Sequence, residues 1–381
     1  MDYSLTPEQE MVRKVMRKFT TEKIQPIAAE VDEQEVFPAE NIKLLAEMGV
    51  MGMIYPKEYG GSGTDSISYA IAIEEISKAC ATTGCIVAAH SSLCCGPIFY
   101  FGTKEQKEKY LPDLLTGRKI GGFGLTEPNA GTDSAAQETT AVLVDDEYYL
   151  LNGSKMFITN GGVADTFVIF AMTDKTKGNY GISCFIIEKG WEGFSQGPHE
   201  KKMGIRGSST CELIFEDVKV PKENMIGREG QGFKIAMQTL DSGRVGVAAQ
   251  ALGIAQGALD EAIEYSKTRV QFGRPIATKQ GLQWMMADMH VRTEAARQLV
   301  YRAAYAKDHQ KRFTEEAAMA KLYASETAMW VTTKAVQIHG GYGFTRDYPV
   351  ERMMRDAKIT EIYEGTSEVQ RMIISGSILR K

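Results

Sequence analysis

Apolar residues in the first part of the chain recur with the spacing of helices. Thr6, Pro7 and Gln9 supply an N-cap, a first-turn proline and a capping-box residue, and apolar positions then recur every three or four residues up to Phe19. Further helical patterns, separated by glycine and proline breaks, cover residues 39–48, 66–80, 83–101 and 104–116. We therefore expect an entirely helical first domain over residues 1–120.

The middle of the chain, residues 121–231, changes to short runs typical of β-strands. The runs at 140–144 and 148–151 flank an acidic turn at Asp145 and Asp146, and Asn152-Gly153 is expected to form another turn. Further strands are expected at residues 167–170, 182–187 and 212–215. This pattern predicts a β domain.

From residue 232 to residue 381 the helical pattern returns. Helices are expected at residues 232–267, 279–308, 314–339 and 366–379. An alanine-rich face over residues 244–252 allows helices to approach closely, which favours a bundle. The pattern by itself supports a mixed α and β fold whose three blocks pack as one compact subunit.

Composition excludes several classes of function. A chain of 381 residues is long enough for two or three domains, and its net charge of −5, with both signs interspersed, offers no basic field for nucleic acid. No uninterrupted apolar run approaches the roughly 20 residues needed for membrane insertion, and the start lacks the features of a signal peptide. The six cysteines show no C-x-x-C spacing and the five histidines are scattered, so we expect reduced thiols, no metal and a cytoplasmic location.

One carboxylate near the C-terminus stands out as a candidate base. Glu364 lies between Tyr363 and Gly365, a sequence that suggests a tight apolar turn, and Thr366 begins a new helical pattern. Burial there would raise the pKa of Glu364 and make it a stronger base toward a weakly acidic carbon. Taken alone, a glutamate at a helix start is more often a cap or a solvated charge.

The run I-Y-E-G-T-S-E-V-Q-R at residues 362–371 resembles the C-terminal signature of the acyl-CoA dehydrogenase family, whose catalytic base is the glutamate of Tyr-Glu-Gly. The run G-L-T-E-P-N-A-G-T-D at residues 124–133 resembles the flavin-contacting loop of that family, and N-G-S-K-M-F-I-T-N-G at 152–161 resembles its second flavin segment. The resemblance runs from about residue 3 to the C-terminus and is closest to the short-chain, butyryl-CoA type. It implies an α+β architecture of an N-terminal helical domain (1–120), a middle β domain (121–231) and a C-terminal four-helix bundle (232–381).

The reaction of this family requires a hydride acceptor, which no side chain provides, so a cofactor must supply it. The resemblance names the cofactor as FAD. Phe157 stands where close relatives commonly have tryptophan, so an aromatic ring is kept. The residues that we expect to bind FAD are Phe123, Leu125, Thr126, Gly131, Thr132, Phe157, Ile158, Thr159, Arg269, Gln280, Gln337, Gly340, Gly341, Thr366 and Glu368.

Read singly, several of these residues have simpler explanations. Thr126 can bond its own backbone, residues 159–161 can form a hairpin turn, and the Gly340-Gly341 pair can be an ordinary loop. Residues 227–232 lack the strand-turn-helix context of a dinucleotide fingerprint, which disfavours nicotinamide. In the family, the residues matching Arg269, Gln280 and the 337–341 segment come from the neighbouring subunit, which implies a homo-oligomer, a dimer of dimers.

The expected substrate contacts are Thr132, Asp241, Arg244, Tyr363 and Gly365, because residues 240–244 resemble the substrate and CoA contact segment of the family. Asp241 and Arg244 are also spaced for a simple intrahelical ion pair. Some branched-chain and long-chain relatives carry their base at the position of Gly243, which here has no side chain, so Glu364 must be the base if the family mechanism operates. Residues 83–90 lack the pocket arginine of glutaryl-CoA dehydrogenases, which argues against a dicarboxylate substrate.

The resemblance implies dehydrogenation of butyryl-CoA to crotonyl-CoA, a reaction that can also run in reverse. Glu364 would take the α-proton while hydride passes to flavin N5, and the Glu364 N–H with a ribityl hydroxyl would stabilise the enolate-like charge. Electrons would then pass to an electron-transferring flavoprotein. The alternatives are a dehydrogenase of medium or branched acyl-CoA, an acyl-CoA oxidase, which the compact length disfavours, and a flavin-free acyl-CoA-binding protein, which would not need Glu364, Thr126, Thr159 and Arg269 together.

Overall fold

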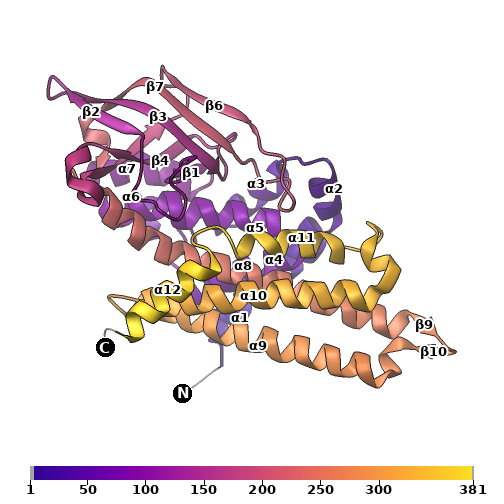
Figure 1. Ribbon diagram of the computed structural model, residues 1–381. Coiled ribbons are helices and arrows are strands. Elements are labelled where there is room, and N and C mark those ends of the chain that lie inside the picture. Colours follow the sequence, from indigo (N-terminus) through magenta and orange to yellow (C-terminus); the bar gives the residue numbers. More distant parts are fainter. Residues whose placement is uncertain (1–3, 380–381) are drawn as a thin grey trace.

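A computed structural model describes residues 4–379 (Figure 1). The first helix begins as the sequence predicts, because the Thr6 hydroxyl accepts a hydrogen bond from Gln9 N at 3.2 Å and the Gln9 side chain accepts one from Thr6 N at 3.0 Å. The α-helices of the N-terminal region are α1 (Pro7–Phe19), α2 (Ala28–Glu33), α3 (Ala39–Glu47), α4 (Ser66–Ala79), α5 (Ala81–Ala88), α6 (Gly96–Phe101) and α7 (Lys104–Leu115).

Helices α5 and α6 are joined by a π-helical segment, Ala89–Cys95, into one continuous apolar rod. By length and composition alone, Ala81–Phe101 is the one helical segment of the described chain able to cross a membrane. Its most apolar window is 83% buried inside the protein. This segment is therefore a core helix. A helix surrounded by protein is as apolar as one that crosses a membrane, so it passes the same test of length and composition.

The middle region forms an eight-stranded sheet in the order β6-β7-β3-β2-β4-β5-β8, with β1 added beside β4. Its strands are β1 (Gly121–Gly124), β2 (Thr140–Val144), β3 (Tyr148–Ile158), β4 (Thr166–Met172), β5 (Ile182–Glu188), β6 (Phe194–His199), β7 (Cys211–Pro221) and β8 (Met225–Ile226). Strand β4 is buried on both faces. Because side chains alternate along a strand, Phe170 enters the core shared with the helices while Ile169 enters a separate core on the other face of the sheet.

The turn expected at Asn152-Gly153 is wrong, because β3 continues through both residues to Ile158. The pairing with β7 shifts register between Leu151 and Gly153, which marks a β-bulge. Gly153 has a φ of 136°, and a Cβ there would lie 2.7 Å from the Thr139 Cα. Glycine is needed for the bulge, and the extended strand carries the second flavin segment toward the helices.

The C-terminal region is a helical bundle that also contacts the N-terminal helices. Its helices are α8 (Gly232–Thr268), α9 (Gln280–His309), α10 (Thr314–His339), α11 (Val350–Thr360) and α12 (Ser367–Ile378), with a small hairpin of β9 (Val270–Gln271) and β10 (Arg274–Pro275) between α8 and α9. Small buried residues such as Ala251, Ala324 and Ala328 allow close packing of α8 and α10. Ile73 of α4 and Leu252 of α8 belong to one core, so the two helical regions share their interior.

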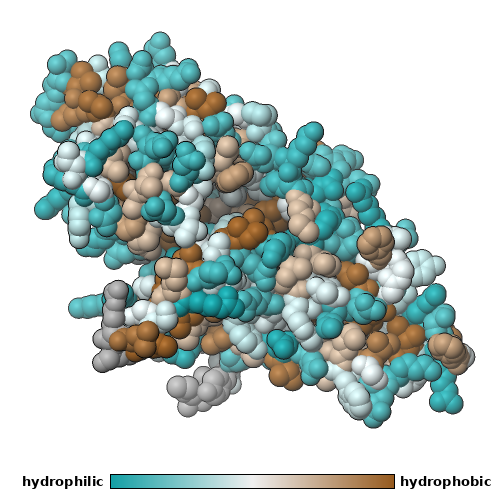
Figure 2. Space-filling view, in the orientation of Figure 1, coloured by the Kyte–Doolittle hydropathy of each residue, from teal (hydrophilic) through white to brown (hydrophobic). Residues whose placement is uncertain are grey.

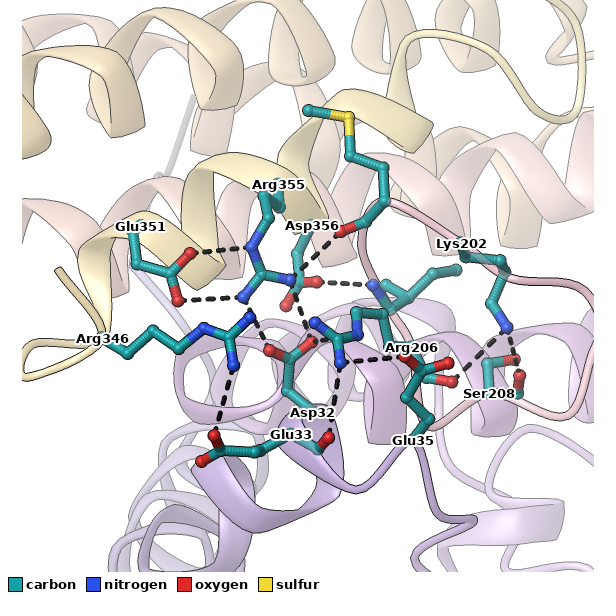
Figure 3. A network of polar contacts seen from close by, with 12 residues as sticks. Asp32, Glu33, Glu35, Lys202, Arg206, Ser208, Arg346, Glu351, Arg355 and Asp356 are labelled. Carbon is teal, nitrogen blue, oxygen red and sulfur yellow. Dashed lines mark hydrogen bonds and ion pairs between the residues drawn. The ribbon is translucent and has the colours of Figure 1, made fainter. Parts of the chain in front are cut away.

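A network of ion pairs and hydrogen bonds fixes α11 against two other parts of the chain (Figure 3). Arg355 pairs with Asp32 of α2 at 2.6 Å and with Glu351 at 2.7 Å. Next to it, Asp356 accepts a hydrogen bond from the backbone N of Ile205, which lies between β6 and β7, at 2.5 Å. Burial raises the pKa of Asp356 to about 6. The helix that leads to Glu364 is thus anchored to both other regions.

Replacing Arg355 by methionine is expected to destabilise the fold by about 3 kcal/mol, because Asp32 would lose its closest cation within a largely buried network. The matched control is Arg346→Met, whose ion pair with Glu33 has side chains 64% and 65% exposed. Such exposed pairs contribute at most about 1 kcal/mol. Urea denaturation followed by circular dichroism measures both variants. Equal losses of stability would show that the buried network does not hold α11.

Candidate active site

A cleft of about 210 Å³ lies between the sheet and the C-terminal helices. Figure 2 shows the surface hollowed between these two parts, with hydrophobic residues in the hollow. Residues from β1, the end of β3, α5, α8 and the segment between α11 and α12 line it. The expected site residues that line this cleft are Phe123, Leu125, Thr126, Gly131, Thr132, Phe157, Ile158, Thr159, Arg244, Tyr363, Glu364 and Gly365.

Glu364 lies in the short turn between α11 and α12. Its φ is 53° and that of Gly365 is 95°, so two consecutive residues adopt the left-handed conformation. Such a conformation is unfavourable for glutamate and persists only when its surroundings hold it. After the turn, the Thr366 hydroxyl accepts a hydrogen bond from Val369 N at 3.4 Å and caps α12.

One oxygen of the Glu364 carboxyl group has no hydrogen-bond donor beside it. The residue lines the cleft, but its Oε2 is enclosed and makes no hydrogen bond. Burial raises the pKa of Glu364 to about 7, against the opposing positive charges of Lys321 and Arg244. A carboxylate with such a pKa is able to act as a base near neutral pH.

Gly243 on α8 leaves the space that this carboxyl group occupies. A Cβ at position 243 would lie 2.0 Å from Glu364 Oε2 and 2.7 Å from Leu93 Cδ2. Real Cβ contacts are never that close. A side chain at position 243 and the observed placement of Glu364 therefore exclude each other.

Two residues that hold the turn were missed by sequence reasoning. The Tyr363 hydroxyl donates to Gln250 Oε1, and the Gln250 Nε2 in turn donates to Ala81 O at 3.0 Å. On the other side, Gln370 Nε2 donates to the carbonyl oxygens of Glu364 and Gly365 at 3.3 and 2.8 Å. Both glutamines are fully buried, and no local sequence signal distinguishes them from surface glutamines.

The two expected flavin segments meet through a buried lysine. Lys155 Nζ lies 2.6 Å from Glu127 Oε1 and 3.3 Å from Leu125 O, and Met156 N donates to Thr126 O at 2.8 Å. Burial lowers the pKa of Lys155 to about 8, an effect that Glu127 opposes. The ion pair thus ties the end of β1 to the end of β3, where both segments face the cleft.

The cleft side of these segments fits a flat aromatic cofactor. Phe157 has a φ of 59° and is 62% exposed, an unusual state for a large aromatic residue that a stacked ring would cover. In the described structure, the hydroxyls of Thr126 and Thr159 form no hydrogen bond and remain available to the edge of an isoalloxazine. These features are compatible with a flavin at this side of the cleft.

The other expected FAD residues lie elsewhere on the chain. Arg269, Gly340 and Gly341 line a separate cavity at the far end of α8, where the Arg269 guanidinium lies 5.3 Å from the Tyr342 ring centre. At 1.5 Å per residue, Arg269 is roughly 35 Å along α8 from Arg244. Gln280 and Gln337 are exposed near that end, in the first turn of α9 and the last turns of α10. One copy of the chain does not bring the two sets together.

Three further expected residues do not line the cleft. Asp241 accepts from Arg244 at 2.6 Å and from the Thr314 hydroxyl at 2.6 Å, which satisfies its carboxylate within the protein. Thr366 serves as the cap of α12, and Glu368 is exposed in its first turn. The described residues contain no group of three or more histidines, cysteines or acids arranged to hold a metal, and the six cysteines are free and buried.

Comparison with known proteins matches the whole chain to one family. Models of the acyl-CoA dehydrogenase N-terminal, middle and C-terminal domains match residues 6–118, 122–218 and 230–379. A short-chain specific acyl-CoA dehydrogenase from Clostridium acetobutylicum is 64% identical over 380 residues, covering 100% of both chains.

Solved structures agree with this match. Butyryl-CoA dehydrogenase from Megasphaera elsdenii is 55% identical, with a TM-score of 0.98 and 100% of both chains covered. A chain in a structure concerned with the electron transferring flavoprotein of Acidaminococcus fermentans and flavin-based electron bifurcation is 56% identical, also with a TM-score of 0.98 and 100% of both chains covered. This chain therefore belongs to the acyl-CoA dehydrogenase family and is an FAD-dependent acyl-CoA dehydrogenase.

Proposed function

We propose that this chain interconverts butyryl-CoA and crotonyl-CoA, with Glu364 as the base that removes the α-proton. The observation that carries the proposal is the enclosed Glu364 Oε2, which makes no hydrogen bond and lies in the same cleft as the flavin segments. The names of the similar proteins, short-chain specific and butyryl-CoA dehydrogenase, support the substrate class.

Each of these residues of the cleft is proposed to have a separate role in the reaction. Glu364 accepts the α-proton, and FAD, when bound, supplies the hydride acceptor at N5 and a ribityl hydroxyl as a hydrogen-bond donor. The backbone N–H of Glu364 makes no hydrogen bond within the described structure and is available to the thioester oxygen. A donor of this kind is worth about 3 kcal/mol when charge develops on the oxygen. Arg244 reaches the cleft while its charge is balanced by Asp241.

We also propose that the FAD site is completed by a second copy of the chain, in a dimer that pairs into a tetramer. The two sets of FAD residues lie in separate cavities, too far apart to act within one subunit. Large apolar side chains near the second cavity, Phe272 and Phe344, are 93% and 88% exposed, which is typical of surfaces that another chain covers.

We propose a cytoplasmic location, because the free, buried cysteines suit the reducing cytoplasm.

Electrons are proposed to be exchanged with an electron-transferring flavoprotein. The support is the 56% identical chain found in the structure concerned with such a flavoprotein. A medium-chain or branched-chain substrate is the second candidate, and a direct comparison of substrates separates the two.

Anaerobic addition of butyryl-CoA is expected to bleach the flavin absorbance faster and more completely than octanoyl-CoA or isovaleryl-CoA. Stopped-flow spectroscopy of the purified flavoprotein measures the three rates under the same conditions. Faster bleaching by octanoyl-CoA or isovaleryl-CoA would reassign the substrate class and leave the base assignment intact.

Replacing Glu364 by glutamine is expected to lower the rate of bleaching by butyryl-CoA at least about 100-fold, because the amide cannot accept the proton. The matched control is Glu361→Gln, which removes a nearby carboxylate that pairs with Lys358 and does not line the cleft. The flavin spectrum and the affinity for butyryl-CoA report whether each variant still forms the complex. A Glu364→Gln variant with near-parental rates would mean that another residue is the base.

The rate of butyryl-CoA oxidation is expected to rise with pH through about 7, the pKa of Glu364, because only the ionised carboxylate accepts a proton. Reduction of crotonyl-CoA requires the protonated form and is expected to fall over the same range. Single-turnover rates in both directions from pH 5.5 to pH 9 test this. Parallel pH dependence in the two directions contradicts the assignment.

A further inference from the structure

Lys321 is a buried lysine with no counter-ion in contact. It lies in the first half of α10 and has no exposed surface. Its hydrogen bond goes to the backbone oxygen of Gly365 at 2.7 Å, and it forms no ion pair in the described part of the chain. Burying an ammonium group destabilises a protein unless a nearby group of opposite charge or a hydrogen-bond acceptor stabilises it.

The hydrogen bond of Lys321 falls on the turn that carries Glu364. Gly365 O accepts from Lys321 Nζ and from Gln370 Nε2, and Glu364 O accepts from Arg244 Nε at 3.3 Å. Three side chains from α8, α10 and α12 therefore hold the two left-handed residues by their carbonyl oxygens. Lys321 and Gln370 share one acceptor, but only Lys321 brings a charge to it.

Few ionised groups face the carboxyl group of Glu364. Burial raises the pKa of Tyr69 on α4, of Cys85 on α5 and of the neighbouring Tyr363, so these three groups are neutral near pH 7. Arg244 on α8 is charged, but its guanidinium is paired with Asp241 at 2.6 Å.

Lys321 on α10 is then the cation of this site that has no ion-pair partner among the described residues. Lys321 and Glu364 each shift the pKa of the other. Lys321 is the leading positive charge that counteracts the effect of burial on Glu364. In return, burial lowers the pKa of Lys321 to about 8, and Glu364, followed by Glu361 and Glu368, is the main acid that opposes this. Neither Glu361 nor Glu368 lines the cleft.

We propose that Lys321 is a positioning residue for the base: its ammonium fixes the turn through Gly365 O and supplies a positive charge that favours the ionised form of the Glu364 carboxylate. The inference rests on Glu364 being the base, as proposed above. In the proton transfer, the substrate C–H bond breaks, an O–H bond forms on Glu364, and the electron pair stays on the substrate. Lys321 neither gives nor takes a proton in this step.

The test compares Lys321→Met with Gln370→Leu. Each variant loses one donor to Gly365 O, but only Lys321→Met loses a charge. Anaerobic bleaching of the flavin by butyryl-CoA is measured in single turnovers from pH 5.5 to pH 9.5. In Lys321→Met the acid limb of the pH–rate profile is expected to move to higher pH by about one unit. A positive charge close to a carboxylate lowers the pKa of that carboxylate by at least that much. The rate below pH 7 then falls about tenfold and recovers at high pH.

Gln370→Leu is expected to lower the rate by the same factor at every pH, since it changes the geometry of the turn alone. An unmoved acid limb in Lys321→Met, or a shift of the same size in Gln370→Leu, would overturn the proposal. Lys321→Gln, which keeps a neutral donor, carries the same test if Lys321→Met does not yield folded flavoprotein.

A second readout does not depend on turnover. Infrared difference spectra of the protein without substrate follow the C=O stretch of the protonated Glu364 carboxyl, which is assigned by its loss in Glu364→Gln. The midpoint of this titration is expected at higher pH in Lys321→Met than in the parent. An active Glu364→Gln variant would refute the base assignment itself, whereas an inactive one together with an unshifted Lys321→Met titration refutes only the role of Lys321.

Discussion

A half-buried glutamate whose enclosed Oε2 has no hydrogen-bond partner is the constraint on which this site depends. Removing a carboxylate from water is unfavourable, so the surrounding protein must fix the position of Glu364 rather than let it turn toward solvent. Helix α11 is anchored to α2 by an ion pair and to the segment between β6 and β7 by a hydrogen bond, and donors from α8, α10 and α12 hold the next turn. The site therefore draws its order from all three regions of the chain.

The sequence predicted the long helices and the central strands, because these depend on local periodicity. It also placed Glu364 in a contiguous motif, and the structure puts this residue in the cleft. Helices α2 and α11 were not predicted, although the second of them leads to Glu364. The turn expected at Asn152-Gly153 was wrong because a glycine with positive φ suits a bulge inside a strand as well as it suits a turn.

The partners of the site were harder to find in the sequence for a physical reason. Lys321 lies in an alanine-rich helix, where a single lysine usually marks a solvated face, and only the packing of α10 against the turn buries it. Gln250 and Gln370 are also buried only by the packing of the helices, so the sequence does not distinguish them from surface glutamines. The residues expected to bind FAD are divided between two cavities, and this division depends on where the ends of α8 lie. The order of motifs along a chain does not give their distance in space.

The close approach between Gly243 and Glu364 has a consequence for how such proteins diverge. A catalytic carboxylate on α8 would need the volume that Glu364 Oε2 fills, since even a Cβ there would lie 2.0 Å from it. An acid gained on the helix first would force the Glu364 side chain out of its observed place, and loss of Glu364 first would remove the proposed base. Under the proposed role of Glu364, moving the base between the two positions therefore calls for coordinated changes at both of them.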